Sequence, residues 1–395
     1  MQALKGVKVV DLTRALSGPF SAMIFADLGA DVIKVEQAPK GDMSRDWGPF
    51  DRGVSTYYLS CNRNKRGICL DFRKPEGMAA IHKLVDSADI LLENFKPGTA
   101  EAMGLDYATL STRNPRLVMG SINAFGTDGP ISHWPGFDQI AQGYSGLMSL
   151  TGYPDGDPTR TGTAIGDLSS GMWLSMAVLA ALLEREHTGR GQHVSTSLLS
   201  SLVGLLSVHG QRYLSLGDVP RRTGNAHSVI APYGVFQTQD GPLNLAPITT
   251  AMWERLCDLL NLQELPTDPR FLSNDDRVAN RDALKEILES RLKARGKREW
   301  TEIFINAGLP AGPINTLDEV FDDPQVQHCK LTRTLNHPAL GPMLQVITPV
   351  FGNKEPEVHR APPLLGEHTV EVLLEAGIDP LTIDSLLTSK SAFQG

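Results

Sequence analysis

One segment near the N-terminus constrains the fold more than any other feature of the sequence. Residues 7–10 form a short apolar run typical of a buried strand, and residues 13–19 contain turn-forming Ser, Gly and Pro. Residues 20–28 have helical periodicity, and residues 31–35 form a second apolar run. A strand, a helix and a strand in this order predict a βαβ unit, because parallel strands need a crossover connection.

The same alternation continues through the first half of the chain. The further predicted elements are strands 67–70, 90–92 and 117–122 and a helix at 75–85. They predict an α/β fold with a parallel sheet and helices on its faces. Two strongly apolar helices, expected at 168–184 and 198–216, have few polar positions, so we expect them to be buried against other elements or a partner subunit.

A polar, turn-rich stretch at 217–225 (GDVPRRTGN) predicts a domain boundary. The chain of 395 residues exceeds the ~150 residues of an ordinary domain, which agrees with more than one domain. We expect the N-terminal part of a large α/β domain at 1–216, a small domain with a hairpin and helices at 225–328, and a C-terminal segment at 335–395 that returns to the large domain. After Cys329 the chain is expected to be extended and proline-rich as far as Pro363.

Charge and cysteine content narrow the class of protein. The formal net charge of −8 disfavours a nucleic-acid binder or a binder of anionic membranes, since both need a basic surface. The four cysteines show no paired spacing, so we expect no disulfide framework, no metal site and a reducing cytoplasm. The longest apolar stretch, 172–183, is too short to span a bilayer, and the N-terminus lacks a signal-peptide pattern. These features predict a soluble, cytoplasmic protein.

Several familiar catalytic and nucleotide-binding signatures are missing. The turn after the first predicted strand has a single glycine, Gly18, where a dinucleotide fingerprint needs three. The sequence has no phosphate-binding G-x-x-x-x-G-K-[ST] loop and no zinc-protease H-E-x-x-H, and the stretch 143–147 departs from the serine-hydrolase elbow at its last position. We therefore disfavour NAD binding, nucleotide hydrolysis, zinc proteolysis and serine hydrolysis.

Two features are candidates for chemistry, each with a structural alternative. Basic residues cluster at 62–66 and at Arg73–Lys74, with Lys96 near the end of the next strand; they could bind a multiply charged phosphate ligand or form a solvated basic surface. Asp167 follows small and apolar residues and directly precedes a long apolar helix. It is either a helix N-cap or a desolvated nucleophile stabilised by the helix N-terminal amides.

A series of short motifs runs in order along nearly the whole chain. The motifs are VDLTR at 10–14, SGP at 17–19, LGADVIKVE at 28–36, GD at 41–42, NRNKR at 62–66, ENFKPG at 93–98, GFD at 136–138, GD at 166–167 and PLLGEHT at 363–369. In these motifs the chain resembles the class III CoA-transferases, the group of formyl-CoA and carnitine CoA-transferases. The resemblance implies a Rossmann-like parallel-sheet large domain, a smaller α+β domain and an interlocked-ring homodimer.

The resemblance makes Asp167 the catalytic nucleophile. In such a reaction its carboxylate attacks the thioester carbonyl, which gives a mixed anhydride and CoA thiolate; the thiolate then attacks the aspartyl carbonyl and leaves an aspartyl-CoA thioester. The acceptor acid repeats these steps in reverse. CoA and acyl-CoA are therefore expected as substrates, with no tightly bound cofactor, and a carboxylic acid and a second copy of the chain as the other partners.

The resemblance also implies a set of CoA contacts. These are Arg14, Leu16, Ser17, Leu70, Asp71, Phe72, Arg73, Asn94, Phe95, Lys96, Ala102, Met103, Phe137 and Asp138. The chain departs from formyl-CoA transferase at Leu16 and Gln37, where that enzyme has glutamine and arginine, and it has no counterpart of the glycine-rich active-site loop around 246–250. These departures disfavour formate and oxalate as substrates.

Further motifs resemble the branch that transfers CoA among dicarboxylic acids, such as succinate:hydroxymethylglutarate CoA-transferase. They are STYYLS and NRNK within 55–65, GPIS at 129–132, SGLM at 145–148, GDP at 156–158, LLSS at 198–201 and GPIN at 312–315. The resemblance favours a dicarboxylate substrate, whose distal carboxylate would contact Arg14, Arg45 or His227.

Two alternatives to a transferase remain open at the level of sequence. The related α-methylacyl-CoA racemases use a histidine in a Gly-His-Asp motif, and this chain has Phe137 at that position, so a racemase would lack a general base. The other alternative is a non-catalytic acyl-CoA-binding protein on the same fold. Phe137 disfavours the racemase, and the presence of Asp167 favours the transferase over the non-catalytic protein.

Overall fold

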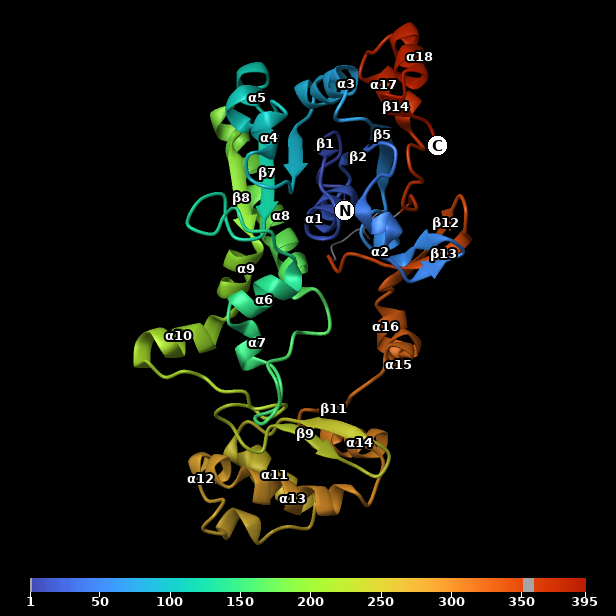
Figure 1. The fold of residues 1–395 in the computed structure, drawn as a ribbon. Helices are drawn as coiled ribbons and strands as arrows, with labels where there is room; N and C mark the ends of the chain where they lie inside the picture. The colour runs from blue at the N-terminus through green and yellow to red at the C-terminus, as the bar shows by residue number, and fades with distance from the viewer. Residues whose placement is uncertain (1, 351–358) are drawn as a thin grey trace. The chain divides into compact units, whose positions relative to one another are not determined.

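The contacts of the chain divide it into two compact units. A computed structural model describes residues 2–350 and 359–395 (Figure 1). The first unit contains the N-terminal residues as far as Leu147, the segment Arg160–Asp218 and the C-terminal residues from Lys330. The second unit contains Met148–Thr159 and Val219–Cys329.

A seven-stranded sheet forms the centre of the first unit. Its strand order is β14-β5-β2-β1-β6-β7-β8, and every neighbouring pair is parallel except β14 with β5. The strands are β1 (Lys8–Asp11), β2 (Asp31–Gln37), β5 (Lys65–Leu70), β6 (Ile90–Glu93), β7 (Val118–Asn123), β8 (His193–Ser197) and β14 (Ala392–Phe393). The predicted α/β fold with a parallel-sheet core is confirmed.

Helices cover both faces of this sheet, which explains why its strands are apolar on both sides. On one face, Val9 packs in a cluster with α1 (Ser17–Asp27) and α8 (Ile165–Thr188). On the other face, the next residue, Val10, packs in a second cluster. The helices that contribute buried residues to that cluster are α3 (Pro75–Asp86), α4 (Thr99–Ala102), α5 (Tyr107–Arg113), α17 (Thr369–Glu375) and α18 (Pro380–Thr388).

Helix α8 is long and apolar enough to cross a membrane by length and composition alone, although half of its apolar window is buried within the protein. It packs against α1, β7 and β8. This packing is that of a core helix in an α/β layer. It also extends beyond the apolar stretch 172–183, since Ser169 and Ser170, which precede that stretch, are buried helical residues.

The remaining helices of the first unit include one departure from the sequence prediction. The single helix expected at 198–216 is two helices, α9 (Leu198–Leu205) and α10 (Ser207–Leu216), since Ser207 has a positive φ of 42°. The shorter elements are β3 (Phe50–Asp51), β4 (Val54–Ser55), α2 (Thr56–Ser60), α4 (Thr99–Ala102), α6 (Asp138–Tyr144) and the 3-10 helix at Met43–Asp46; α7 (Leu147–Leu150) runs from the first unit into the second.

The C-terminal segment contains a hairpin that the sequence analysis did not predict. Strands β12 (Thr332–His337) and β13 (Gly341–Val346) pair antiparallel, where an extended proline-rich chain was expected. Residues 351–358 of this segment lie outside the described residues. Farther on, β14 pairs with β5, and Arg66 of β5 forms ion pairs with Glu371 and Glu375 of α17.

The second unit combines a small antiparallel sheet with helices. The hairpin predicted around residues 240–241 is confirmed by β9 (Gly234–Gln237) and β10 (Pro242–Leu245), with β11 (Ala311–Pro313) along β10. Its helices are α11 (Thr250–Leu259), α12 (Asn274–Ala279), α13 (Arg281–Leu292), α14 (Lys297–Asn306), α15 (Leu317–Asp322) and α16 (Pro324–His328), with a 3-10 turn at Leu265–Thr267.

The segment Met148–Thr159 belongs to the second unit, although the sequence analysis placed all of 1–216 in the large domain. Long-range hydrogen bonds explain this difference. The amide of Gly224 donates to the carbonyl of Gly152 at 3.0 Å, and Arg222 donates to the carbonyl of Gly156 at 2.7 Å. Local composition carries no sign of these pairings.

Candidate active site

A pocket of about 380 Å³ lies in the first unit where the order of its sheet reverses. Strands β1 and β6 are neighbours, but the chain leaves β1 towards β2 on one side and leaves β6 towards β7 on the other. The loops after such strands separate and leave a crevice at the carboxyl edge of the sheet. The predicted site residues that line this pocket are Arg14, Ser17, Asn94, Lys96, Phe137, Asp138 and Asp167.

Asp167 lies in the first turn of α8 and is half-buried. Burial and, to a smaller extent, the nearby negative charge of Asp138 together raise the pKa of its carboxyl group to about 7. The N-cap position of α8 is Ala164, so the N-cap interpretation of Asp167 is wrong. Asp167 is thus a carboxylate in the first turn of a helix. The helix dipole favours its ionised form, and desolvation disfavours it.

A buried chain of hydrogen bonds fixes the start of α8. The amide of Gly166 donates to Oδ1 of Asp138 at 2.7 Å, and Nε2 of Gln142 donates to Oδ2 of Asp138 at 2.6 Å. The amide of Thr161 in turn donates to Oε1 of Gln142 at 3.0 Å. Asp138 and Gln142 are both buried. Both carboxylate oxygens of Asp138 therefore have internal partners. Its hydrogen bond to the Gly166 amide fixes the backbone directly before Asp167.

Small residues let α8 approach α1 closely. A Cβ atom at Gly171 would lie only 2.7 Å from the carbonyl oxygen of Ser17, and the hydroxyls of Ser21 and Ser175 are 2.9 Å apart. This close packing sets α8 against the N-terminus of α1, which begins at Ser17 in the wall of the same pocket.

Buried ion pairs hold the loop that follows β1. Nζ of Lys34 lies 2.9 Å from the Asp42 carboxylate and donates to the carbonyl of Thr13 at 2.9 Å. Oδ1 of Asp42 accepts from the amide of Ala15 at 3.0 Å. Burial alone would raise the pKa of Asp42, but the charge of Lys34 and the hydrogen bonds it accepts lower it to about 2. The pair therefore stays charged and fixes the pocket wall.

The basic run at 62–66 is neither a phosphate site nor a solvated surface, so both sequence interpretations are wrong. Arg63 and Lys65 are almost completely buried. Lys65 pairs with Asp11 at 3.0 Å, Arg63 pairs with Asp27, and Arg66 pairs with Asp31 at 2.7 Å. A buried cation needs such a partner, because its desolvation is otherwise too costly.

Cations remain available at the pocket itself. The side-chain amide of Asn94 accepts from the backbone amide of Arg14 and donates to its carbonyl, both at 2.8 Å, so it pins the loop after β1. The guanidinium of Arg14 lies 5.5 Å from the centre of the Phe95 ring. Arg14 and Lys96 are both exposed, so a positive edge borders the pocket.

Other predicted CoA contacts lie outside this pocket lining. Leu70 and Phe95 belong to the hydrophobic core, and the side chain of Leu70 has no exposed surface, so it cannot contact CoA. Asp71 pairs with the exposed Arg73 at 2.8 Å. Leu16 directly precedes α1, and Ala102 is exposed in α4. Phe72, two residues after β5, and Met103 are partly buried and pack against the core.

Neither Arg45 nor His227 is among the residues that line the pocket around Asp167. Arg45 donates to both carboxylate oxygens of Glu36 at 2.7 Å and lies 3.7 Å from the centre of the Tyr58 ring. Its charge is therefore neutralised by Glu36, and its prediction as a substrate contact is not supported. His227 belongs to the second unit, where it stacks on Tyr233 with ring centres 4.8 Å apart.

Tyr57 and Gln142 were missed in the sequence. Burial raises the pKa of Tyr57 to about 12, and the nearby charge of Asp167 acts in the same direction, so the phenol stays protonated. Tyr57 lines the pocket and packs edge-to-face on Trp47 at 5.1 Å. Tyr57 lies in the STYYLS motif, but nothing in that motif separates it from Tyr58. Gln142 carries no sequence signal.

The fold and site define an α/β protein with a desolvated carboxylate at the switch point of a parallel sheet, an arrangement suited to covalent catalysis by aspartate. Residues 4–369 match the model of CoA-transferase family III. The chain belongs to this family and is a class III CoA-transferase.

Individual relatives agree with this assignment. Succinyl-CoA:glutarate CoA-transferase of Mus musculus is 40% identical over 98% of this chain and 90% of its own length. Acetyl-CoA:oxalate CoA-transferase of Acetobacter aceti is 40% identical over 81% of this chain and 82% of its own. A crystal structure of a CAIB/BAIF family protein from Brucella suis is 39% identical, with a TM-score of 0.86 over 94% of this chain and 98% of the other.

Proposed function

We propose that this enzyme moves CoA from succinyl-CoA to a small dicarboxylic acid of the glutarate type, with Asp167 as the covalent nucleophile. The observation that carries the proposal is the half-buried Asp167 carboxylate in the switch-point pocket, with a pKa of about 7. A carboxylate with that pKa is ionised in part at neutral pH and poorly solvated, and both properties favour attack on a thioester.

The proposed reaction balances in four steps. The Asp167 carboxylate attacks the thioester carbonyl, and the carbon–sulfur bond breaks to give a mixed anhydride and CoA thiolate. The thiolate then attacks the Asp167 carbonyl, which releases the donor acid and leaves an aspartyl-CoA thioester. The acceptor carboxylate attacks that thioester, and thiolate attack on the new anhydride gives the product acyl-CoA and frees Asp167. Amides at the start of α8 could stabilise the oxyanions.

The acceptor class rests on the similarity of this chain to the mouse succinyl-CoA:glutarate CoA-transferase along nearly its whole length. The exposed cations Arg14 and Lys96 at the pocket edge would suit anionic groups of CoA or of the acid. The racemase alternative is less suitable, since Phe137 lines the pocket where a histidine base would be required.

A substrate panel tests the proposal. We expect succinyl-CoA to give new thioesters with glutarate at a kcat/KM at least tenfold above that with valerate, because the second carboxylate forms a charge-assisted contact worth about 1.5–3 kcal/mol. Equal rates with valerate would remove the dicarboxylate class.

A second candidate reaction is transfer from acetyl-CoA to oxalate, which the 40% identity to the Acetobacter aceti enzyme favours. The same panel therefore includes acetyl-CoA as donor and oxalate as acceptor. A higher kcat/KM for this pair than for succinyl-CoA with glutarate would replace the first candidate.

We further propose a homodimer with interlocked chains in the cytoplasm, without nucleic-acid or membrane partners. Large apolar side chains are exposed along α8, α9 and α10 of the single chain. They include Met172, Trp173, Met176, Leu183, Val203, Val208, Leu214 and Leu216. A monomeric soluble protein rarely exposes so many on consecutive elements, so a partner surface is their expected cover.

A further inference from the structure

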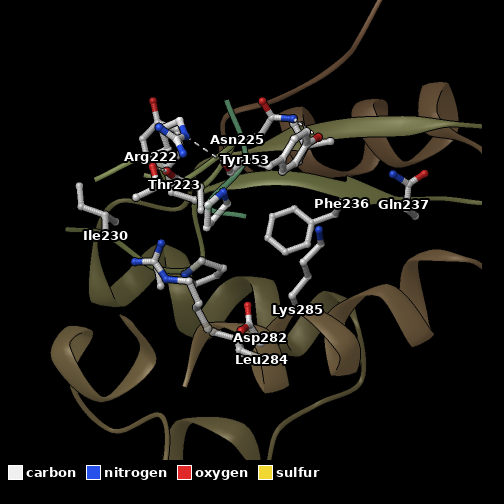
Figure 2. A pocket seen from close by; sticks show the side chains of 17 residues that line it. Tyr153, Arg222, Thr223, Asn225, Ile230, Phe236, Gln237, Asp282, Leu284 and Lys285 are labelled. Atoms are coloured by element: carbon white, nitrogen blue, oxygen red, sulfur yellow. Dashed lines mark hydrogen bonds between the residues drawn. The ribbon is translucent and has the colours of Figure 1, made fainter. Parts of the chain in front are cut away.

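The second unit contains a pocket of its own, separate in sequence from the residues around Asp167. Its volume is about 350 Å³, within the range of small-molecule sites. Every residue that lines it belongs to the second unit. Figure 2 shows Arg222 on one side of this pocket and Asp282 on the opposite side, with Phe236 and Lys285 to the right of the view.

Two arginines of this pocket carry charge that no carboxylate neutralises. Arg222 donates to the carbonyls of Tyr153 at 3.2 Å and Gly156 at 2.7 Å, and Arg281 donates to the carbonyl of Val278 at 3.3 Å. Within residues 2–350 and 359–395, no ion pair includes either arginine. Neutral carbonyls orient a guanidinium without cancelling its charge, so both remain able to bind an anion.

The charges around the pocket leave a positive balance. Besides the two arginines, the lining contains Lys285, whose Nζ lies 3.8 Å from Glu289, and the exposed Asp282. Lys285 is paired with Glu289, so the two unpaired arginines against Asp282 leave a net charge of +1. Two unpaired guanidiniums offer two separate anion contacts, which suits a ligand with a carboxylate at each end.

The rest of the wall combines apolar and aromatic residues with the polar Thr223, Asn225 and Gln237. It contains the rings of Tyr153, Tyr233 and Phe236 and the prolines Pro154 and Pro232. Such a surface suits a short aliphatic chain between charged ends, whereas a fully hydrated inorganic ion gains nothing from it.

We propose that this pocket, the Arg222–Arg281 pocket, binds a free aliphatic dicarboxylate of about the length of glutarate. Arg222 and Arg281 supply the charge, and the aromatic rings contact the methylenes. The inference rests on the proposed function for the identity of the acid, and it assigns a binding site for the free acid that shares no lining residue with the pocket around Asp167.

Equilibrium binding of glutarate to the full-length protein without CoA tests this proposal. We expect Arg222→Gln and Arg281→Gln each to weaken glutarate binding at least tenfold, as loss of a charge-assisted contact does. Arg221→Gln is the matched control, since Arg221 is exposed and does not line the pocket. Valerate should bind the wild type at least tenfold more weakly than glutarate.

Arg222 also joins segments of its unit, so Arg222→Gln could unfold it. In that case the glutarate affinity of Arg281→Gln, with its folding checked by circular dichroism, tests the proposal. Arg281→Lys keeps the positive charge and should bind glutarate within a few-fold of the wild type. Unchanged glutarate binding in folded Arg281→Gln would overturn the proposal. Weaker glutarate binding in Lys96→Gln but in neither arginine variant would also overturn it, because the acid would then bind near Asp167. If the arginine variants weakened the binding of CoA but not of glutarate, the ligand of the pocket would be a phosphate, and the proposal would again be wrong.

The two proposals fail separately. Absence of any thioester product with dicarboxylates would refute the proposed reaction. The binding measurements would still show whether the Arg222–Arg281 pocket binds glutarate. Active transfer together with unchanged binding in the arginine variants would refute the pocket and leave the reaction standing.

Discussion

Asp167 combines two opposing influences on one carboxyl group. The helix dipole stabilises its anion, whereas burial and the charge of Asp138 raise its pKa to about 7. A nucleophile with this pKa is ready to react at neutral pH, but its ionised form costs folding free energy. Function and stability should therefore respond to Asp167 in opposite directions.

The pH profile of transfer follows from this pKa. Because only the ionised carboxylate attacks, we predict that kcat/KM rises with pH and levels off above an apparent pKa of about 7. Initial rates at subsaturating succinyl-CoA between pH 5.5 and 8.5 measure it. A profile that is flat from pH 5.5 upwards would contradict the raised pKa.

Stability should have the opposite pH dependence. The pKa of Asp167 is about 7 in the folded state and 3.8 in the unfolded state, so the unfolded chain loses its proton at a lower pH. The contribution of Asp167 to the free energy of unfolding is therefore fully present below pH 4 and is lost as the pH rises from about 4 to 7. We predict that Asp167→Asn abolishes transfer and is more stable than the wild type by about 2 kcal/mol above pH 7, a value reduced for partial exposure. The difference should vanish near pH 4 in urea denaturation.

Asp138 is predicted to tune Asp167. In Asp138→Asn the negative charge is lost, so the apparent pKa of kcat/KM should fall below that of the wild type. The side-chain NH2 of the new asparagine can face Nε2 of Gln142, and two donor groups cannot form a hydrogen bond with each other. We therefore expect the free energy of unfolding to fall by about 1–3 kcal/mol. Asp128→Asn, at an exposed loop position, is the charge-matched control and should leave the pH profile unchanged. An unshifted profile in a folded Asp138→Asn would contradict this role.

At the scale of single elements, sequence periodicity was sufficient for the parallel strands β1, β2, β5, β6 and β7, and insufficient for β8 and for the hairpin β12–β13. Strand β6 is buried throughout, and its apolar run is easily recognised, whereas β5 begins two residues before the predicted 67–70 because the buried Lys65 and Arg66 belong to the strand. The hairpin exposes Leu344 and contains Pro342, so its alternation does not differ from an extended loop. The local pattern around Asp167 left the N-cap and nucleophile interpretations open, and the prediction of a nucleophile came from the family motif at 166–167. Asp138 and Thr161 act over gaps of 28 and 19 residues, and local patterns do not report such partners.

The contact between α1 and α8 is the element-scale prediction. Gly171→Ala should destabilise the protein by about 1–3 kcal/mol, because the new Cβ meets the carbonyl oxygen of Ser17 at 2.7 Å and separates the helices. It should also lower kcat/KM, since both helices start in the pocket wall. Gly162→Ala is the control, as its Cβ meets no atom within 4 Å. Thermal unfolding that leaves the two variants equal would contradict the predicted close contact.

For the whole molecule, the proposed dimer makes a prediction about the exposed apolar helices. Leu214 and Leu216 of α10 are 78% and 73% exposed in the single chain. We predict a dimer at micromolar concentration in light scattering, and aggregation or unfolding when both are changed to Glu, since charges would be buried in the interface. Leu381→Glu, at an 81% exposed position in α18, should leave the dimer intact. A folded, active wild-type monomer would contradict the dimer.

The central claim is that Asp167 is acylated during turnover, and trapping of that intermediate tests it most directly. The enzyme is mixed with succinyl-CoA, quenched with hydroxylamine, digested and mapped by mass spectrometry. We predict a hydroxamate on the peptide that contains Asp167, and no modification in Asp167→Asn. A modification at another residue, or full transfer activity in Asp167→Asn, would contradict the claim.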